Sequence, residues 1–348
     1  MKPFVLFCAG IAALILQGCG TAYYYAEFIH PSKTYIPAKI YHVGIVDKAT
    51  IASTKAAVFT SGIPFESVSG LPQIVAHKTI EDLKKKLIEI GRYNPLTITW
   101  PPDSVVNKPF SQPAMHPTTI DSLCRSYGID GLIVLEAVEL SINTRGSVDV
   151  GTTTDPAGMP VRVPEFTSQS QVTYTLLWRF YDNLHSATAD SFQETYQLSF
   201  TKVAYTQEEA MNTDPKEMNL SDVSNLAALD YFQRISPYWK EDFRIYYQTG
   251  SPAFYRIGQN LDYDGNWEVA ATEWEKFTDN AESSLAYKAY YNLAVAGEMM
   301  GNPRKAKMFL EQALEIKDTR QAKNYMEQLK KQILIYDVVN AQLGNTKN

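Results

Sequence analysis

Few residues of this 348-residue chain have types and spacings that could carry out chemistry. Five histidines are scattered without an i,i+4 pair, an H-E-x-x-H motif or a cysteine at ligand spacing: His30, His42, His77, His116 and His185. A zinc site needs such a cluster, so no metal site is expected. The chain also lacks the G-x-S-x-G, G-x-G-x-x-G and P-loop motifs. We therefore expect no cofactor, and no motif names a reaction.

Carboxylates are a second possible source of catalysis. Glu136 and Glu139 are three residues apart in the apolar run 132–142, which is predicted to be a strand. On a regular strand this separation places the side chains on opposite faces, which disfavours an acid–base pair. Asp47 ends an earlier predicted strand, and a cleft between Asp47 and Glu136 would support a hydrolase. We interpret both residues instead as turn and edge polar groups.

Cys19 is the third candidate, at the end of an amino-terminal leader. Lys2 is followed by the apolar run 4–16 and then by Gly18 and Cys19, the order typical of a secretory signal peptide. The run is too short for a spanning helix, which needs about 20 apolar residues. An uncleaved anchor helix and a secreted protein with an incidental Cys19 are the alternatives.

Residues 16–19, Leu-Gln-Gly-Cys, resemble a bacterial lipobox. The resemblance implies that Cys19 receives a diacylglycerol on its thiol, that residues 1–18 are removed, and that the new amino terminus is acylated. Several acyl chains matter because one chain anchors a protein only marginally. Cleavage removes Cys8 and leaves Cys124 as the other thiol, so no intramolecular disulfide is expected. Cys124 lies on the apolar face of a predicted helix and should be buried.

The composition indicates a globular, multidomain protein. Removing residues 1–18 from 348 leaves 330, which is enough for two or three domains. A hydrophobic content of 45% and 22 tyrosines exclude general disorder. The net charge is −6, and the basic run at 84–86 lies on a predicted helix as a solvated face. Nucleic acid is therefore not an expected partner.

Residues 39–237 are predicted to form an α+β domain with a mixed sheet. The periodicity of apolar residues predicts strands at 40–45, 95–100 and 132–142, and helices around 80–90, 118–127 and 219–235. Alternation at 169–182 and 189–200 predicts an antiparallel hairpin. Residues 146–168, rich in Gly, Pro, Thr and Val, fit a loop or a protruding hairpin.

This order of elements, with a hairpin after "YGIDGLIVLEA", resembles the small α/β domain shared by the curli-secretion lipoprotein family and the amino-terminal domain of the Tol system's propeller protein. The resemblance implies a fold only, because unrelated functions share folds. Ahead of this domain, residues 19–38 contain Pro31 and Pro37 and should form an extended tether.

Residues 253–338 contain an internal repeat. At a shift of 36 residues the matching pairs are Phe254 with Tyr290, Ile257 with Leu293, Gly258 with Ala294, Gly265 with Gly301, and Ala270 with Ala306. The second copy, which continues to Phe309 and Ala313, resembles the tetratricopeptide pattern of paired helices. In such pairs small residues let the helices approach, larger ones fill the seam, and glycine permits the turn. We expect two repeats with a capping helix, then a flexible tail at 339–348.

Residues 238–252 are the expected joint between the two domains. The joint is rich in aromatic residues, which we expect to form interdomain core rather than a ligand platform: Trp239, Phe243, Tyr246 and Tyr247.

The mature chain as a whole resembles an uncharacterised family of Bacteroidota lipoproteins with a domain of unknown function. The residues that carry the resemblance are "EFIHPSKTYIPAKIYHVGIVDKA", "RISPYWKEDFRIYY" and "GNWEVAATEW". It implies a phylum and a location in the cell envelope, but no reaction.

These observations predict a lipid-anchored envelope protein, not an enzyme. Its helical repeats would serve as an interaction or assembly scaffold for an envelope protein whose identity the sequence does not reveal. Between Cys19 and Phe28 the one acidic residue is Glu27, which favours the periplasmic face of an outer membrane.

Two other classes of function stay open. One is a glycan-binding outer-membrane lipoprotein, for which Trp100 and Trp178 are the free aromatic candidates, because Trp267 and Trp274 occupy packing positions of the repeat. The other is a hydrolase that uses Asp47 or Glu136.

Overall fold

The computed structural model describes residues 20–51, 55–56, 71–100, 110, 113–211, 220–279 and 283–344. The chain divides into two compact units, which we describe separately. The first unit consists of residues 1–31 and 239–341, and the second of residues 32–238 and 342–348. The lipidation candidate Cys19 lies outside the described residues. Within the described part of the chain, no helix is long and apolar enough to cross a membrane.

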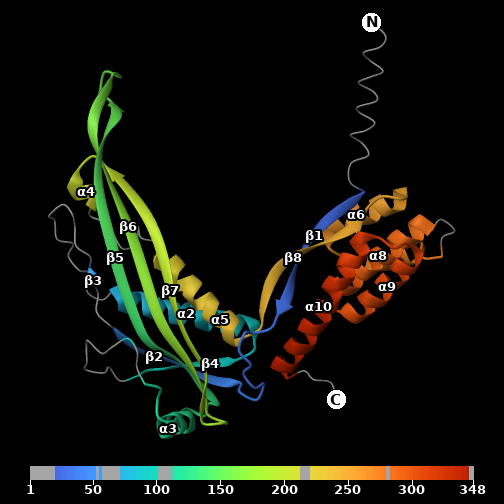
Figure 1. The fold of residues 1–348 in the computed structure, drawn as a ribbon, viewed down its shortest axis with the longest axis horizontal. Coiled ribbons are helices and arrows are strands. Elements are labelled where there is room, and N and C mark those ends of the chain that lie inside the picture. Colours follow the sequence, from blue (N-terminus) through green and yellow to red (C-terminus); the bar gives the residue numbers. More distant parts are fainter. Residues whose placement is uncertain are drawn as a thin grey trace. The chain divides into compact units, whose positions relative to one another are not determined.

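The second unit is built around a six-stranded mixed sheet (Figure 1). Strands β4, β2 and β5 are parallel, whereas β5, β6 and β7 are antiparallel. The strand order is β4 (Asn94–Ile98), β2 (His42–Ile51), β5 (Gly131–Thr154), β6 (Pro160–Asp182) and β7 (Ala187–Ala204), with β3 (Lys55–Ala56) beside β5. This arrangement confirms an α+β class with a mixed sheet, and the β6–β7 pair confirms the predicted antiparallel hairpin.

Helices lie on both faces of this sheet. Two long helices pack over one face and one shorter helix over the other. The long helices are α2 (Leu71–Ile90) and α5 (Leu220–Ile235), the shorter one is α3 (Pro117–Tyr127), and a single turn, α4 (Gln207–Met211), lies beside β6 and β7.

Strand alternation divides the core of this unit into two clusters. The larger cluster lies under α2 and α5 and takes alternate residues of β6, including Tyr174, Leu176 and Trp178, as their shared face predicted. The smaller cluster lies under α3 and includes Cys124, which is buried as expected. Strands β2, β5 and β6 thus each supply residues to both faces.

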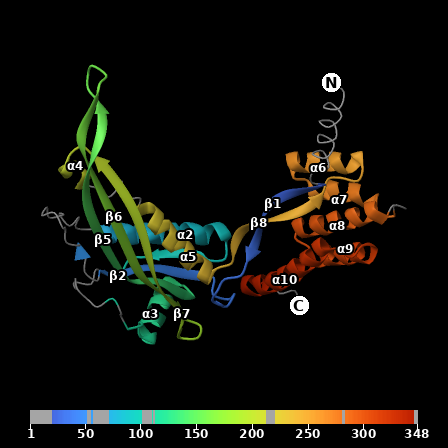
Figure 2. The ribbon, with the colours of Figure 1, turned by 45° about the horizontal axis from the view of Figure 1, so that its top comes forward.

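Strands β5 and β6 continue well beyond this core. They stay paired from Gly131 with Asp182 as far as Thr154 with Pro160. The turn closes where the Asp155 N–H donates to the carbonyl of Met159 at 2.9 Å. Figure 2 shows the paired strands projecting past α4. The alternative of a protruding hairpin at 146–168 is therefore confirmed.

In its described residues, the first unit consists of a two-stranded sheet and five helices. Strand β1 (Thr21–His30) pairs with β8 (Tyr238–Tyr247). Gly20 contacts Gln248 while Tyr25 contacts Phe243, so the two strands run in opposite directions. The helices are α6 (Pro252–Asp264), α7 (Trp267–Glu275), α8 (Ser283–Met299), α9 (Pro303–Ile316) and α10 (Arg320–Leu343).

The expected extended tether at 19–38 is corrected by strand β1. The carbonyl oxygen of Gly20 accepts hydrogen bonds from the Gln248 N–H at 3.1 Å and the Thr249 hydroxyl at 3.0 Å. Ala22 and Tyr24 then pack against the core of the helices. Burial of these side chains fixes the segment, which its prolines alone do not reveal.

The expected joint and tail are corrected as well. Residues 238–247 of the joint form β8, in which Tyr246 is buried but Trp239 and Phe243 are exposed. These last two residues are therefore not core. Helix α10 runs to Leu343, into the segment expected to be flexible, and places Val339 in a buried position.

Candidate functional site

The repeat residues hold the helical pairs α6–α7 and α8–α9 together. The buried members are Phe254, Gly258, Ala270, Leu293, Ala294, Ala306 and Ala313. Tyr290 and Phe309 are half-buried against the same core. Gly265 and Gly301 follow α6 and α8 with positive φ angles of 64° and 74°, a conformation that glycine adopts without strain. These residues pack the array, so a partner protein would contact other side chains.

A close approach of α8 and α9 involves a residue that the repeat comparison missed. A Cβ atom at Gly297 of α8 would lie 3.1 Å from the backbone nitrogen of Ala306 and 3.2 Å from its Cα. The counterpart of Gly297 in the first copy is Leu261. Because the alignment weighs only matching positions, it could not single out this glycine.

Exposed apolar side chains mark the outer surface of α9 and α10. Met308 is 66% exposed and Leu334 is 67% exposed. Arg304 and Asp337 join the two helices through an ion pair of 2.5 Å. On α9, Met308 lies one turn after Arg304, and on α10, Leu334 lies about one turn before Asp337. Met308 and Leu334 therefore lie near this ion pair, on the exposed side of their helices. We name Met308 and Leu334 the array face.

A buried ion pair attaches β8 to the helices. Arg244 Nε and Nη2 each donate to Glu298 at 2.8 Å. The Tyr325 hydroxyl donates to the same carboxylate at 2.8 Å, and the Phe28 ring lies 4.1 Å from the guanidinium. Burial opposes the charge on Arg244, but the hydrogen bonds and charge of Glu298 raise its pKa. The network holds the two-stranded sheet rigidly on α8 and α10.

A second buried charge cluster lies in the sheet of the second unit, around Glu136. This carboxylate is fully buried and lies 3.0 Å from Lys48 Nζ and 3.6 Å from Arg179 Nη1. The Tyr181 hydroxyl donates a hydrogen bond to it. Burial, and then this hydrogen bond, raise the pKa of Tyr181 to about 12. Two cations and a neutral phenol therefore surround one buried carboxylate and balance its charge.

A β-bulge corrects the expected directions of Glu136 and Glu139. The register of β5 with β6 shifts between Leu135 and Ala137. Leu135 and Val138, three residues apart, consequently both point into the core under α2 and α5. Glu136 and Glu139 therefore share the opposite face, because an extra residue restores the alternation.

Asp47 and Glu136 lie on opposite faces of the sheet. On β2, Ile45 points into the core under α2 and Val46 into the core under α3. Alternation puts Asp47 with Ile45, near His77 of α2, and Lys48 with Glu136. Desolvation raises the pKa of Asp47. The two carboxylates thus do not face each other as an acid–base pair would.

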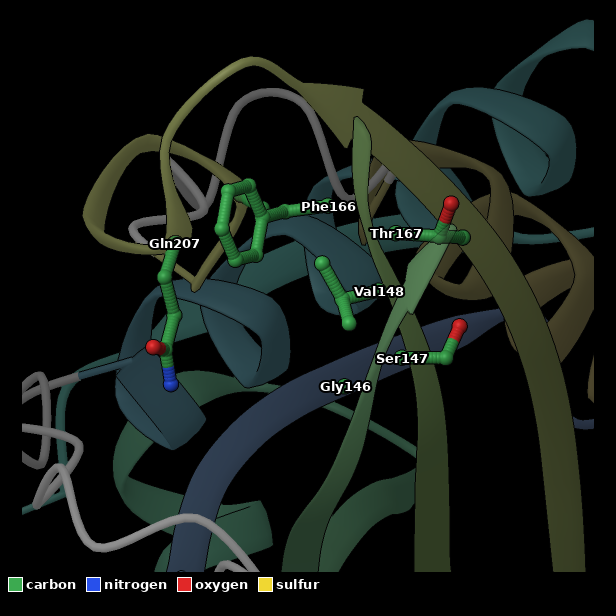
Figure 3. Close-up of a pocket in the computed structure, with 7 residues that line it drawn as sticks. Gly146, Ser147, Val148, Phe166, Thr167 and Gln207 are labelled. Carbon is green, nitrogen blue, oxygen red and sulfur yellow. The ribbon is translucent and has the colours of Figure 1, made fainter. Parts of the chain in front are cut away.

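A small hollow of about 230 Å³ lies beside α4, where the long hairpin leaves the core (Figure 3). The paired residues Val148 and Phe166 form one wall, and Gln207 of α4 lies opposite them. The described lining residues include no titratable side chain. This hollow can admit a small apolar group but offers no catalytic acid or base.

A larger hollow of about 690 Å³ lies along β5, β6 and β7. Its amide, hydroxyl and guanidinium groups come mainly from Asn143, Arg145, Gln169, Gln171, Ser199 and Thr201. Such groups both donate and accept hydrogen bonds. The sequence missed them because they are ordinary outward positions of alternating strands.

The two tryptophans expected as candidates for glycan binding, Trp100 and Trp178, differ in their exposure. Trp178 is fully buried and stacks on Tyr231, with ring centroids 4.8 Å apart. It cannot serve as a glycan platform, so that expectation is corrected. Trp100 is half-buried at the smaller core, with Lys48 Nζ 5.6 Å from its ring centroid.

In the described residues, no group of three or more His, Cys, Asp or Glu side chains could hold a metal ion.

Comparison with protein families finds two matches along the chain. Residues 40–247 match the family described as a domain of unknown function, DUF8603. The chain belongs to this family. In this DUF8603 member, residues 256–331 also match a second domain of unknown function, DUF6340. None of the curated proteins matches the chain.

Two solved structures are distantly similar to the DUF8603 member. The PelC dodecamer from Paraburkholderia phytofirmans is 10% identical, with a TM-score of 0.22, over 61% of this chain and 97% of the PelC chain. A protein from Helicobacter pylori, described as a neuraminyllactose-binding hemagglutinin homolog, is 11% identical, with a TM-score of 0.23, over 58% and 87% of the two chains.

Proposed function

We propose that this chain is a lipid-anchored cell-envelope protein whose helical unit binds a partner protein and scaffolds its assembly. The observation that carries the proposal is the setting of Cys19. It ends a leader of the lipoprotein type, and the next residue, Gly20, is hydrogen-bonded to the end of β8. A lipid on Cys19 would therefore join directly to the unit that holds the helical pairs.

The proposed location is the periplasmic face of an outer membrane of the Bacteroidota type. The scarcity of acidic residues after Cys19, where Glu27 stands alone up to Phe28, supports this face. Protease treatment of intact cells should leave the protein whole, whereas treatment of permeabilised cells should digest it. Digestion in intact cells would contradict the periplasmic assignment.

Acylation is tested at Cys19 itself. We expect metabolic labelling with an alkyne fatty acid to mark the wild-type protein and not Cys19→Ser. The intact mass should correspond to residues 19–348 plus acyl groups. A wild-type mass without added lipid would overturn the proposed anchor. The variant Cys8→Ser serves as the matched control, because Cys8 would be removed with the leader.

The tetratricopeptide-like interpretation of α6 to α9 supports the choice of the helical unit as the binding element. Stacked helical pairs present surfaces suited to other proteins, and the array face places two exposed apolar side chains on one such surface. Apolar side chains at the centre of an interface contribute most of its affinity.

This binding is tested by affinity capture from envelope extracts with the full lipidated chain. We expect a partner protein to be recovered with the wild type and lost at least about tenfold with Met308→Lys/Leu334→Lys, because each charge would be buried at the interface. Val148→Lys/Val203→Lys, at exposed apolar positions of the second unit, is the control and should keep the partner. Equal recovery with both variants would refute the array face.

Glycan binding is the second candidate, favoured by the hollow of about 690 Å³ along β5 to β7. Its amides and hydroxyls match the hydrogen-bonding groups of sugars, although Phe200, the aromatic residue among its described lining residues, packs against the core under α2 and α5. A glycan array should then show a ligand that Gln169→Ala/Gln171→Ala loses, while Gln312→Ala on α9 retains it. An array with no ligand would eliminate this candidate.

A further inference from the structure

Strand β1 has two chemically distinct faces. Ala22 and Tyr24 point toward the helices, where the Tyr24 ring meets Trp267 edge-on at 4.8 Å. Tyr23, Tyr25 and Glu27 point the other way and are exposed. Alternation along a strand produces this division. The inner face accounts for the attachment of β1 to its unit, but the aromatic outer face has no role in that packing.

The outer aromatic side chains gather around Phe243 of β8. Its ring centroid lies 5.5 Å from that of Tyr23 and 6.0 Å from that of Tyr25. The three side chains are 43%, 56% and 64% exposed, respectively. We name these three residues the aromatic face. Exposed apolar clusters of this kind mark contact surfaces rather than ordinary solvent-facing positions.

The position of the aromatic face in the chain restricts what can cover it. Tyr23 lies four residues after Cys19, and four extended residues span at most about 14 Å. The apolar run 4–16 and Cys19 precede it directly, so either a lipid on Cys19 or the run itself would place this end of β1 at a bilayer. No free tether intervenes, because the carbonyl of Gly20 is already bound to Gln248 and Thr249.

We infer that the aromatic face lies in the interface of the lipid bilayer and fixes the orientation of the first unit on the membrane. Tyrosine rings favour the headgroup region, where the ring is sheltered and the hydroxyl stays hydrated. The Arg244–Glu298 pair and Asn292 hold β8 on the helices, so a fixed sheet means a fixed helical array. This inference rests on the proposed anchor at Cys19.

The test supplies the lipid chemically. Residues 19–348 are coupled at Cys19 to a maleimide-bearing phospholipid in vesicles of phosphatidylethanolamine and phosphatidylglycerol, with and without brominated acyl chains. Cys124 stays unreacted because it is buried. One variant carries Tyr25→Trp, and a control carries Met308→Trp, at a position of similar exposure. The parent chain provides the background fluorescence of the native tryptophans.

We expect brominated lipid to quench at least about half of the fluorescence added at position 25, and little of that added at position 308. Adding Tyr23→Ser/Phe243→Ser to the Tyr25→Trp chain should reduce this quenching severalfold. Tyr255→Ser/Tyr263→Ser, at exposed positions of α6, should leave it unchanged.

Two results would overturn the inference. One is equal quenching at positions 25 and 308. The other is full quenching at position 25 despite the two serine substitutions, since the short link to Cys19 would then suffice by itself. Because the lipid is attached chemically, a cell that leaves Cys19 unacylated would refute the proposed function without changing this result.

Discussion

Asn292 satisfies both backbone hydrogen-bonding groups of Tyr247. Its Nδ2 donates to the Tyr247 carbonyl at 2.8 Å, and its Oδ1 accepts from the Tyr247 N–H at 2.7 Å. Asn292 is fully buried in α8. At the end of β8, one side chain of α8 therefore makes the two backbone hydrogen bonds that a neighbouring strand would otherwise make.

Asn292→Ala should lower the free energy of unfolding by about 2 to 4 kcal/mol, because two backbone groups lose their buried partner. Urea denaturation followed by circular dichroism measures this change. Gln312→Ala, at an exposed position of α9, should change stability by less than about 0.5 kcal/mol. Equal effects of the two variants would mean that water replaces the Asn292 amide at no cost.

Glu298→Gln should destabilise the first unit by about 3 kcal/mol, because the buried Arg244 guanidinium would keep only the half-exposed Asp242 as a counter-charge. Arg244→Met/Glu298→Met removes both charges, and its loss should be clearly smaller than that of the single variant. Thermal unfolding of both variants tests this order. A double variant less stable than Glu298→Gln would show that the pair contributes net stability.

Glu136→Gln should lower the stability of the second unit by about 2 to 4 kcal/mol, since Lys48 and Arg179 would lose their shared carboxylate. Glu139→Gln changes the same chemical group on the same face of β5, at a half-buried position. We expect less than about 0.5 kcal/mol for it. Chemical denaturation of the two variants makes the comparison, and similar losses would contradict a stabilising role for the charge cluster around Glu136.

Cys124 should make stability depend on pH in the alkaline range. Burial, then the charges of Asp121 and Asp130, raise the pKa of its thiol from 9.0 to about 12. The unfolded chain releases this proton near pH 9 while the folded chain keeps it. The stability is therefore complete below pH 9 and falls as the pH rises toward 12.

Cys124→Ala should reduce the decline in stability between pH 9 and 12 measured by urea denaturation. In a Cys19→Ser chain of residues 19–348, the Cys124 thiol should react with a disulfide reagent at pH 8 at least about a hundredfold more slowly when folded than in urea. Fast reaction of the folded chain would show that the thiol is accessible.

Residue periodicity predicted those elements whose own sequence shows which positions are buried and which are exposed. Tyr174, Leu176 and Trp178 alternate with polar residues, so a strand with one buried face followed directly from them. Gly265 and Gly301 recur at the same place in two similar segments, and both adopt positive φ. These patterns are local, and the structure matches them.

Contacts between distant segments could not be predicted in the same way. The bulge after Leu135 depends on pairing with β6, and it reverses the expected relation of Glu136 and Glu139. Strand β1 is held on its unit by contacts such as the packing of Tyr24 against Trp267, which lies more than 200 residues further along the chain. The spacing of residues within "TAYYYAEF" does not indicate that Trp267 is the partner.

The sequence by itself determined the leader pattern that ends at Cys19, the α+β class of residues 39–237 and the helical pairing after residue 252, because hydrophobic periodicity and small-residue spacing are local records of burial. Only the tertiary structure decided which side of each strand is free. Tyr23 and Tyr25 became an exposed face with Phe243 because β8 and the helices occupy the other side of β1.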